Sequence, residues 1–175
     1  MLAYLKGKPH RGLTFRSGGE DILVGYSDST WGNDPETRRS VSGFVFLLHG
    51  AAVSWKSKLE STVALSSSEA EYQAIARASQ EAAYLRSFLA QLGLPQLAPT
   101  VIFEDNEGCI AMVKNPVSRE KAKHIDIKIK YVNSQYEQGV MAPAPCRTDE
   151  MVADDFTKPV PRPTLEKHLP SYMGE

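Results

Sequence analysis

Residues 65–92 read LSSSEAEYQAIARASQEAAYLRSFLAQL, and this stretch decides the kind of fold that the chain adopts. Seven of its residues follow one another at alternating spacings of four and three, as on one stripe of an amphipathic α-helix. They are Glu71, Ile75, Ala78, Ala82, Leu85, Leu89 and Leu92. Gly93 and Pro95 end the pattern. The sequence therefore predicts a long helix that buries one stripe against another layer.

Three strands are predicted before this helix. Residues 22–28 (ILVGYSD) form the first, with Ile22, Val24, Tyr26 and Asp28 on one face. A loop rich in turn residues follows, and residues 41–49 read VSGFVFLLH. His49 and Gly50 permit a tight turn into a third strand at residues 51–57. Strands joined by such short connections form an antiparallel meander.

Helices and strands alternate after the long helix. We expect strands at 100–105 (TVIFED) and 140–146 (VMAPAPC), and helices at 106–115, 122–138 and 149–157. Prolines in the last strand favour a sheet edge. The order βββ-α-β-α-α-β-α predicts an α/β fold with a mixed sheet and helices on its faces. Residues 1–8 are predicted to end a helix, and the proline-containing residues 159–175 to run along the surface as a tail.

Composition limits the classes of protein to consider. The 175 residues suit one soluble domain, and no apolar run approaches the ~20 residues that a membrane span needs, so no membrane partner is expected. Two unpatterned cysteines indicate reduced thiols in an intracellular protein, and four scattered histidines argue against a zinc site. The net charge is −1, yet residues 114–130 carry six Lys or Arg residues, which form either a phosphate-binding patch or a solvated helix face.

Four acidic residues lie at junctions between predicted strands and helices. They are Asp28, Glu71, Asp105 and Asp154. A carboxylate on an apolar element loses solvation, and a divalent metal ion is a common compensating partner. Carboxylates that converge from distant parts of the sequence therefore suggest a magnesium-dependent phosphoryl-transfer site.

Each of these residues also has a purely structural interpretation. Glu71 and Glu69 each complete a capping box with a serine three residues earlier, but Glu71 lies on the buried stripe and Glu69 points roughly 200° away from it. Asp28 could instead begin an Asx turn. Asp105 could cap the next helix, although Asn106 is equally suited to that role.

The fourth position is open between two neighbours. Met151, Val152 and Phe156 define the apolar side of the segment, and helical spacing slightly favours Asp155 over Asp154 as the inward residue.

Several longer strings make a family resemblance specific. They are AYLKGKPHRGLTF, GYSDSTWGNDPETRRSVSGFVFLLHGAAVSWKSK, STVALSSSEAEYQAIA, DNEGCIAMVKNPV, KHIDIKIKYV and VADDFTKPVPRP, in this order and nearly end to end. The chain resembles the ribonuclease H domain of copia-type LTR retrotransposon polyproteins, downstream of reverse transcriptase. The resemblance implies a ribonuclease H-like fold, with a five-stranded sheet of three antiparallel and then two parallel strands and helices on both faces. It also implies a connection segment at 1–20, the ribonuclease H domain at 21–158 and a C-terminal tail at 159–175.

The resemblance further implies a site and an activity. It assigns Asp28, Glu71, Asp105 and, by the VAD string, Asp154 to a set of four carboxylates that binds two Mg²⁺ ions, for which Mn²⁺ can substitute. The implied reaction is hydrolysis of the RNA strand in an RNA–DNA hybrid during reverse transcription. The implied partners are this hybrid and the reverse transcriptase domain of the same polyprotein, in the cytoplasm, a virus-like particle or the nucleus. An alternative is a catalytically weak or domesticated module that binds nucleic acid or protein.

Basic residues are expected to hold the phosphates of the hybrid without reading its sequence. They are Lys114, Arg119, Lys121, Lys123 and Lys128.

Overall fold

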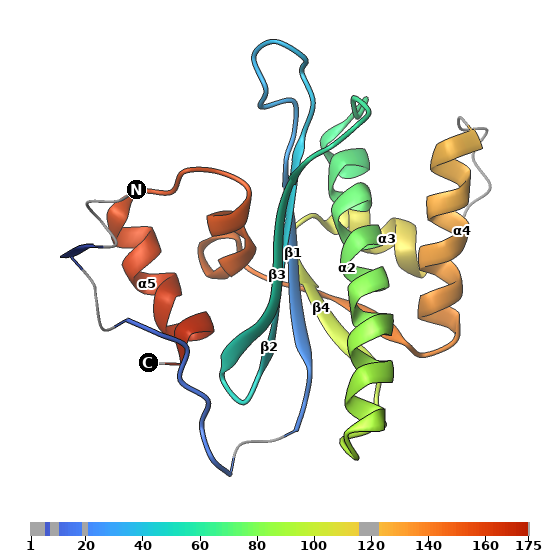
Figure 1. Ribbon diagram of the computed structural model, residues 1–175. Coiled ribbons are helices and arrows are strands. Elements are labelled where there is room, and N and C mark those ends of the chain that lie inside the picture. The colour runs from blue at the N-terminus through green and yellow to red at the C-terminus, as the bar shows by residue number, and fades with distance from the viewer. Residues whose placement is uncertain (1–5, 8–10, 19–20, 116–122, 175) are drawn as a thin grey trace.

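A five-stranded sheet lies at the centre of the computed structural model, which describes residues 6–7, 11–18, 21–115 and 123–174 (Figure 1). The strands are β1 (Val24–Thr30), β2 (Val41–Leu48), β3 (Ala51–Leu59), β4 (Thr100–Glu104) and β5 (Met141–Pro145). Their order is β3-β2-β1-β4-β5, with antiparallel pairing from β1 to β3 and parallel pairing of β4 with β1 and β5. This confirms the predicted mixed sheet, including the proline-containing edge strand.

Helices cover both faces of the sheet, as predicted. One face carries α2 (Ser67–Gln91), α3 (Glu107–Lys114) and α4 (Lys123–Glu137), and the other carries the 3₁₀ turn η2 (Val152–Phe156) and α5 (Arg162–Met173). A second 3₁₀ turn, η1 (Thr148–Glu150), precedes η2. Each described helix is too short or too polar to pass through a lipid bilayer.

Strand β2 explains why two apolar clusters form. Phe44 and Phe46 join the cluster beneath α2, whereas Val45 joins Val152 and Leu169 beneath α5. A strand that is covered on both faces reads as a continuous apolar run rather than an alternating one. The VSGFVFLL sequence therefore reflects its place between two helical layers.

The C-terminal part differs from the prediction. The segment expected as a helix at 149–157 forms the two 3₁₀ turns, and the expected tail contains α5, which packs on β3 and η2. The prolines suggested a tail without helical structure, but Pro163 lies in the first turn of α5, where its missing N–H costs little. Gly174 ends the helix in the left-handed conformation, with a φ of 78°.

The domain boundaries predicted after residues 20 and 158 stay predictions. Described residues on both sides of them form backbone hydrogen bonds. The backbone N–H of Thr14 donates to the carbonyl of Met173 over 2.8 Å, and that of Arg16 donates to the carbonyl of His49 over 3.0 Å. The helix predicted for residues 1–8 lies almost wholly outside the described residues.

Candidate metal centre

Two parallel strands and one helix bring three of the predicted carboxylates together. Strands β1 and β4 run in parallel with Tyr26 opposite Phe103, so Asp28 and Asp105 emerge at the same end of the sheet. Glu71 reaches them from the first turns of α2. One carboxylate oxygen of each residue lies within 4.8 Å of the others. Residues that are far apart in the sequence thus form one acidic cluster.

The structure separates the capping residues from the cluster. Ser66 caps α2 by accepting the N–H of Glu69, and the Glu69 carboxylate accepts the N–H of Leu65 over 2.9 Å. Asn106 caps α3 by accepting the N–H of Cys109, also over 2.9 Å. Neither Glu71 nor Asp105 is needed to cap a helix.

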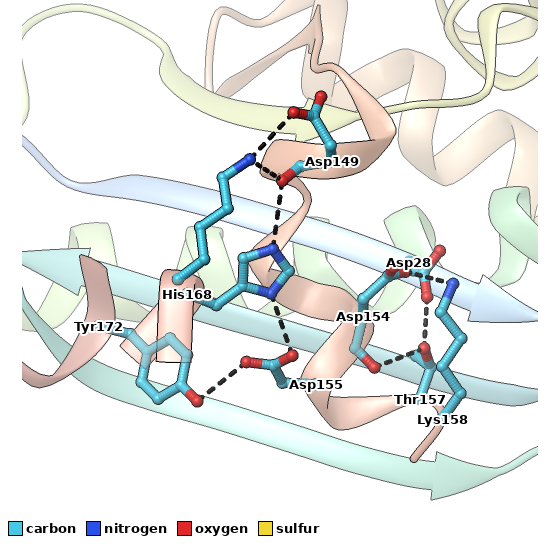
Figure 2. Close-up of polar contacts among 9 residues, drawn as sticks. Asp28, Asp149, Asp154, Asp155, Thr157, Lys158, His168 and Tyr172 are labelled. Atoms are coloured by element: carbon cyan, nitrogen blue, oxygen red, sulfur yellow. Dashed lines mark hydrogen bonds and ion pairs between the residues drawn. The ribbon is translucent and has the colours of Figure 1, made fainter. Parts of the chain in front are cut away.

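The turn η2 brings Asp154 beside Asp28 from the other face of the sheet (Figure 2), although the group of oxygens within 4.8 Å does not include Asp154. The hydroxyl of Thr157 donates a hydrogen bond to Asp28, and the ammonium of Lys158 lies 2.6 Å from the Asp154 carboxylate. Close packing makes this approach possible, because a Cβ at Gly43, which pairs with Asp28 across the sheet, would lie 2.7 Å from the methyl carbon of Thr157.

Asp155 points away from the cluster. Its carboxylate accepts hydrogen bonds from His168 and Tyr172 of α5, both over 3.0 Å. Helical spacing favoured Asp155 over Asp154 as the inward residue, but both side chains are largely buried, with Asp155 at 4% and Asp154 at 8% exposure. The spacing did not show that Asp155 is buried against α5, and a 3₁₀ helix, with three residues per turn, does not follow the spacing of an α-helix.

Burial and mutual repulsion dominate the electrostatics of the site. Burial, then the charge of Asp154, raises the pKa of Asp28 to about 7, although the Thr157 hydrogen bond lowers it. Burial and the charges of Glu104, Asp28 and Asp105 raise the pKa of Glu71 to about 11. The second oxygen of Glu71, Oε2, is buried and has no hydrogen-bond partner among the described residues. A bound cation would offset this repulsion, and carboxylate oxygens are the ligands that Mg²⁺ prefers.

Glu104 is a fifth acidic residue that the sequence reasoning did not include. It is fully buried beside the cluster, where burial raises its pKa well above the usual value. Ser27 and the backbone N–H of Asn106 donate to its carboxyl group. Alternation placed it on the face of Ile102, which is the face covered by α2.

Of the five predicted phosphate-binding residues, the structure describes the side chains of Lys114 and Lys128, so their role in phosphate binding stays a prediction. Lys114 is exposed at the end of α3, whereas Lys128 is half-buried with its ammonium 3.4 Å from the side-chain oxygen of Gln73 on α2. Burial lowers the pKa of Lys128. Arg119 and Lys121 lie outside the described residues, as does the side chain of Lys123.

Comparison with known proteins connects the sequence to mobile elements. The chain is 34% identical over 174 residues, or 99% of its length, to the retrovirus-related Pol polyprotein from transposon RE1 of Arabidopsis thaliana. It is 36% identical over 166 residues, or 95% of its length, to that from transposon TNT 1-94 of Nicotiana tabacum. The chain is a homologue of copia-type retrotransposon Pol polyproteins. It spans 12% of the length of each of these two relatives, and no family model matches it.

Solved structures identify the fold of this copia-type segment. LC11-RNase H1, isolated from compost, is 16% identical and superposes with a TM-score of 0.58 over 86% of this chain and 99% of its own. The N-terminal RNase H domain of rv2228c from Mycobacterium tuberculosis is 11% identical, with a TM-score of 0.56 over 87% of this chain and 99% of its own. The copia-type segment therefore has a ribonuclease H-like fold.

Proposed function

We propose that this chain hydrolyses the RNA strand of RNA–DNA hybrids with the help of two divalent metal ions during retrotransposon reverse transcription. The observation that carries the proposal is the acidic cluster of the buried Asp28 and Glu71 with the half-buried Asp105, in which one Glu71 oxygen has no partner among the described residues. The fold supports it, since the structurally similar LC11-RNase H1 has been solved in complex with an RNA/DNA hybrid.

The four carboxylates Asp28, Glu71, Asp105 and Asp154 would hold the ions. Bound Mg²⁺, or Mn²⁺ in its place, would supply activation of a water molecule and stabilisation of the charge on the leaving oxygen. The protein's own groups prepare the site for this role. Thr157 orients Asp28 through its hydrogen bond, and Lys158 offsets part of the negative charge of Asp154.

Recognition of the substrate would combine charge with contact to the sugar. Lys114, Arg119, Lys121, Lys123 and Lys128 would hold phosphates. The 2′-hydroxyl distinguishes RNA from DNA, and Glu71 or the nearby backbone would contact it. A reverse transcriptase domain in the same polyprotein would supply further grip on the hybrid, since the chain itself carries a net charge of −1.

The test is cleavage of a hybrid with a labelled RNA strand, compared with duplex DNA and single-stranded RNA of the same sequence. We expect Mg²⁺-dependent cuts in the RNA of the hybrid alone, with 3′-hydroxyl and 5′-phosphate ends, and none with Asp105→Asn. Binding of the hybrid without cleavage in Mg²⁺ or Mn²⁺ would instead support a non-catalytic binding module. Preferential cleavage of duplex DNA would support a DNA strand-transfer enzyme.

A further inference from the structure

The turn that carries Asp154 and Thr157 is held from outside by the C-terminal helix. His168 of α5 donates from Nδ1 to the carboxylate of Asp155, and the two side chains are 2% and 4% exposed. The hydroxyl of Tyr172 donates to the other oxygen of the same carboxylate over 3.0 Å. Figure 2 shows this network beside Asp154, with His168 between Asp149 and Asp155. The residue next to a proposed metal ligand is thus fixed at both of its carboxylate oxygens.

Helix α5 also holds the turn before η2. The ammonium of Lys167 donates to the carbonyl oxygen of Asp149 over 2.6 Å and to its carboxylate over 2.9 Å. Nε2 of His168 lies 3.4 Å from the same carbonyl oxygen. Helix α5 therefore contacts both η1 and η2 through the neighbouring side chains of Lys167 and His168.

The sheet fixes η2 from its other side. A Cβ at Gly43 would approach Phe156 Cβ to 2.9 Å and Thr157 Cγ2 to 2.7 Å, so η2 and β2 pack without a gap. With α5 on its outer side, η2 has little freedom to move Asp154 relative to Asp28.

Stability alone does not account for a polar network at this interface. Apolar contacts already join the layers through Val45, Val152 and Leu169. A buried ion pair is often no more stabilising than apolar residues of similar volume. Partners behind a metal ligand, by contrast, orient that ligand and commonly change metal affinity or activity when they are replaced.

We propose that Asp155 and His168 are positioning residues, through which helix α5 holds Asp154 and Thr157 in the arrangement that binds metal beside Asp28. Neither residue is among the four proposed metal ligands. The expected effect on catalysis rests on the proposed function. The position of Asp154 and Thr157 beside Asp28 is a property of the chain itself, and metal binding tests it without nucleic acid.

The test measures Mn²⁺ binding without nucleic acid, by electron paramagnetic resonance titration, in the wild type and in Asp155→Asn, His168→Gln and Tyr172→Phe. We expect about 10- to 100-fold weaker binding for the first two variants and a smaller loss in the same direction for Tyr172→Phe, which keeps its ring. With hybrid as substrate, kcat should fall while KM stays within about twofold, because ground-state contacts with the hybrid are unchanged.

Two control variants of α5 separate positioning from folding. Leu169→Ala removes apolar packing but leaves the hydrogen bonds in place, and Arg162→Ala removes an exposed ion pair with Glu166. All variants are measured below their unfolding temperatures. If Asp155→Asn and His168→Gln bind Mn²⁺ as Leu169→Ala does, the network is only structural and the inference is overturned. If the wild type binds Mn²⁺ but cleaves no hybrid, the proposed function fails while the comparison of affinities still decides this inference.

Discussion

Replacing Asp28 with asparagine should stabilise the metal-free protein while it abolishes cleavage. Asp28 is 4% exposed, and its pKa rises from 3.8 to about 7 in the folded chain. Below about pH 4 the side chain carries its proton in both the folded and the unfolded chain, so it costs nothing. Between about pH 4 and 7 the unfolded chain releases this proton and the folded chain keeps it, so stability falls as the pH rises.

The size of the effect follows from the same values. A difference of about 3 pH units at 1.36 kcal/mol per unit corresponds to about 4 kcal/mol lost by about pH 7. This figure is an upper limit, because a folded chain relaxes around a buried charge. The carboxamide oxygen of the variant would still accept the hydrogen bond from the Thr157 hydroxyl, so Asp28→Asn should gain about 2–4 kcal/mol at about pH 7.5.

Urea unfolding in a chelating buffer measures this gain. The midpoint for Asp28→Asn should exceed that of the wild type at about pH 7.5, and the two should converge near about pH 4. Mg²⁺ at about 100 times its dissociation constant should then stabilise the wild type by about 2.7 kcal/mol and the variant by less. Glu137→Gln, at an exposed position of α4, is the control for loss of a remote negative charge. Equal midpoints at the higher pH, or a gain of the same size at both pH values, would refute the reasoning.

Three further substitutions test separate parts of the structure. Arg77→Ala leaves the buried Glu60 carboxylate without its two-point partner and should cost about 3–5 kcal/mol in urea unfolding, so a loss below about 1 kcal/mol would contradict the role of the pair. Gly43→Ala should displace the turn at Thr157 and lower hybrid cleavage by up to about 100-fold, and unchanged cleavage would show that the close approach is unimportant. Lys128→Ala should weaken hybrid binding in fluorescence anisotropy more at low salt than at high salt, and an effect that ignores salt would count against a phosphate contact.

Periodicity predicted the long helix well because α2 buries one consistent stripe against the sheet. The stripe on α2 distinguished Glu71 from Glu69: Glu71 belongs to the acidic cluster, whereas the Glu69 carboxylate accepts the N–H of Leu65 beside the Ser66 cap. The order of strands and helices was sufficient for the mixed sheet, since a parallel pairing requires a crossover such as α2.

The structure of residues 149–174 was predicted wrongly for physical reasons. Pro163 suggests a break in helical structure when only the sequence is seen, but it costs little in a first helical turn. Spacing rules for an α-helix do not order Asp154 and Asp155 within a 3₁₀ turn. Which one faces Asp28 depends on α5 and Gly43, and these contacts come from distant parts of the chain.

Glu104 illustrates a different limit of prediction from sequence. Alternation along β4 correctly grouped it with Ile102, but it does not tell which face of a strand is covered. The covering helix makes Glu104 a buried carboxyl group beside the site, and it adds to the repulsion that raises the pKa of Glu71.

One measurement tests most directly whether the acidic cluster is the catalytic centre: the rate of RNA cleavage in a labelled hybrid at saturating Mg²⁺, for the wild type and four carboxamide variants. The variants are Asp28→Asn, Glu71→Gln, Asp105→Asn and Asp154→Asn. We expect each single substitution to abolish or nearly abolish cleavage while the fold, followed by circular dichroism, is retained. Cleavage at the wild-type rate by any of the four folded variants would contradict the assignment of that residue, and retention in Asp28→Asn would contradict the site as a whole.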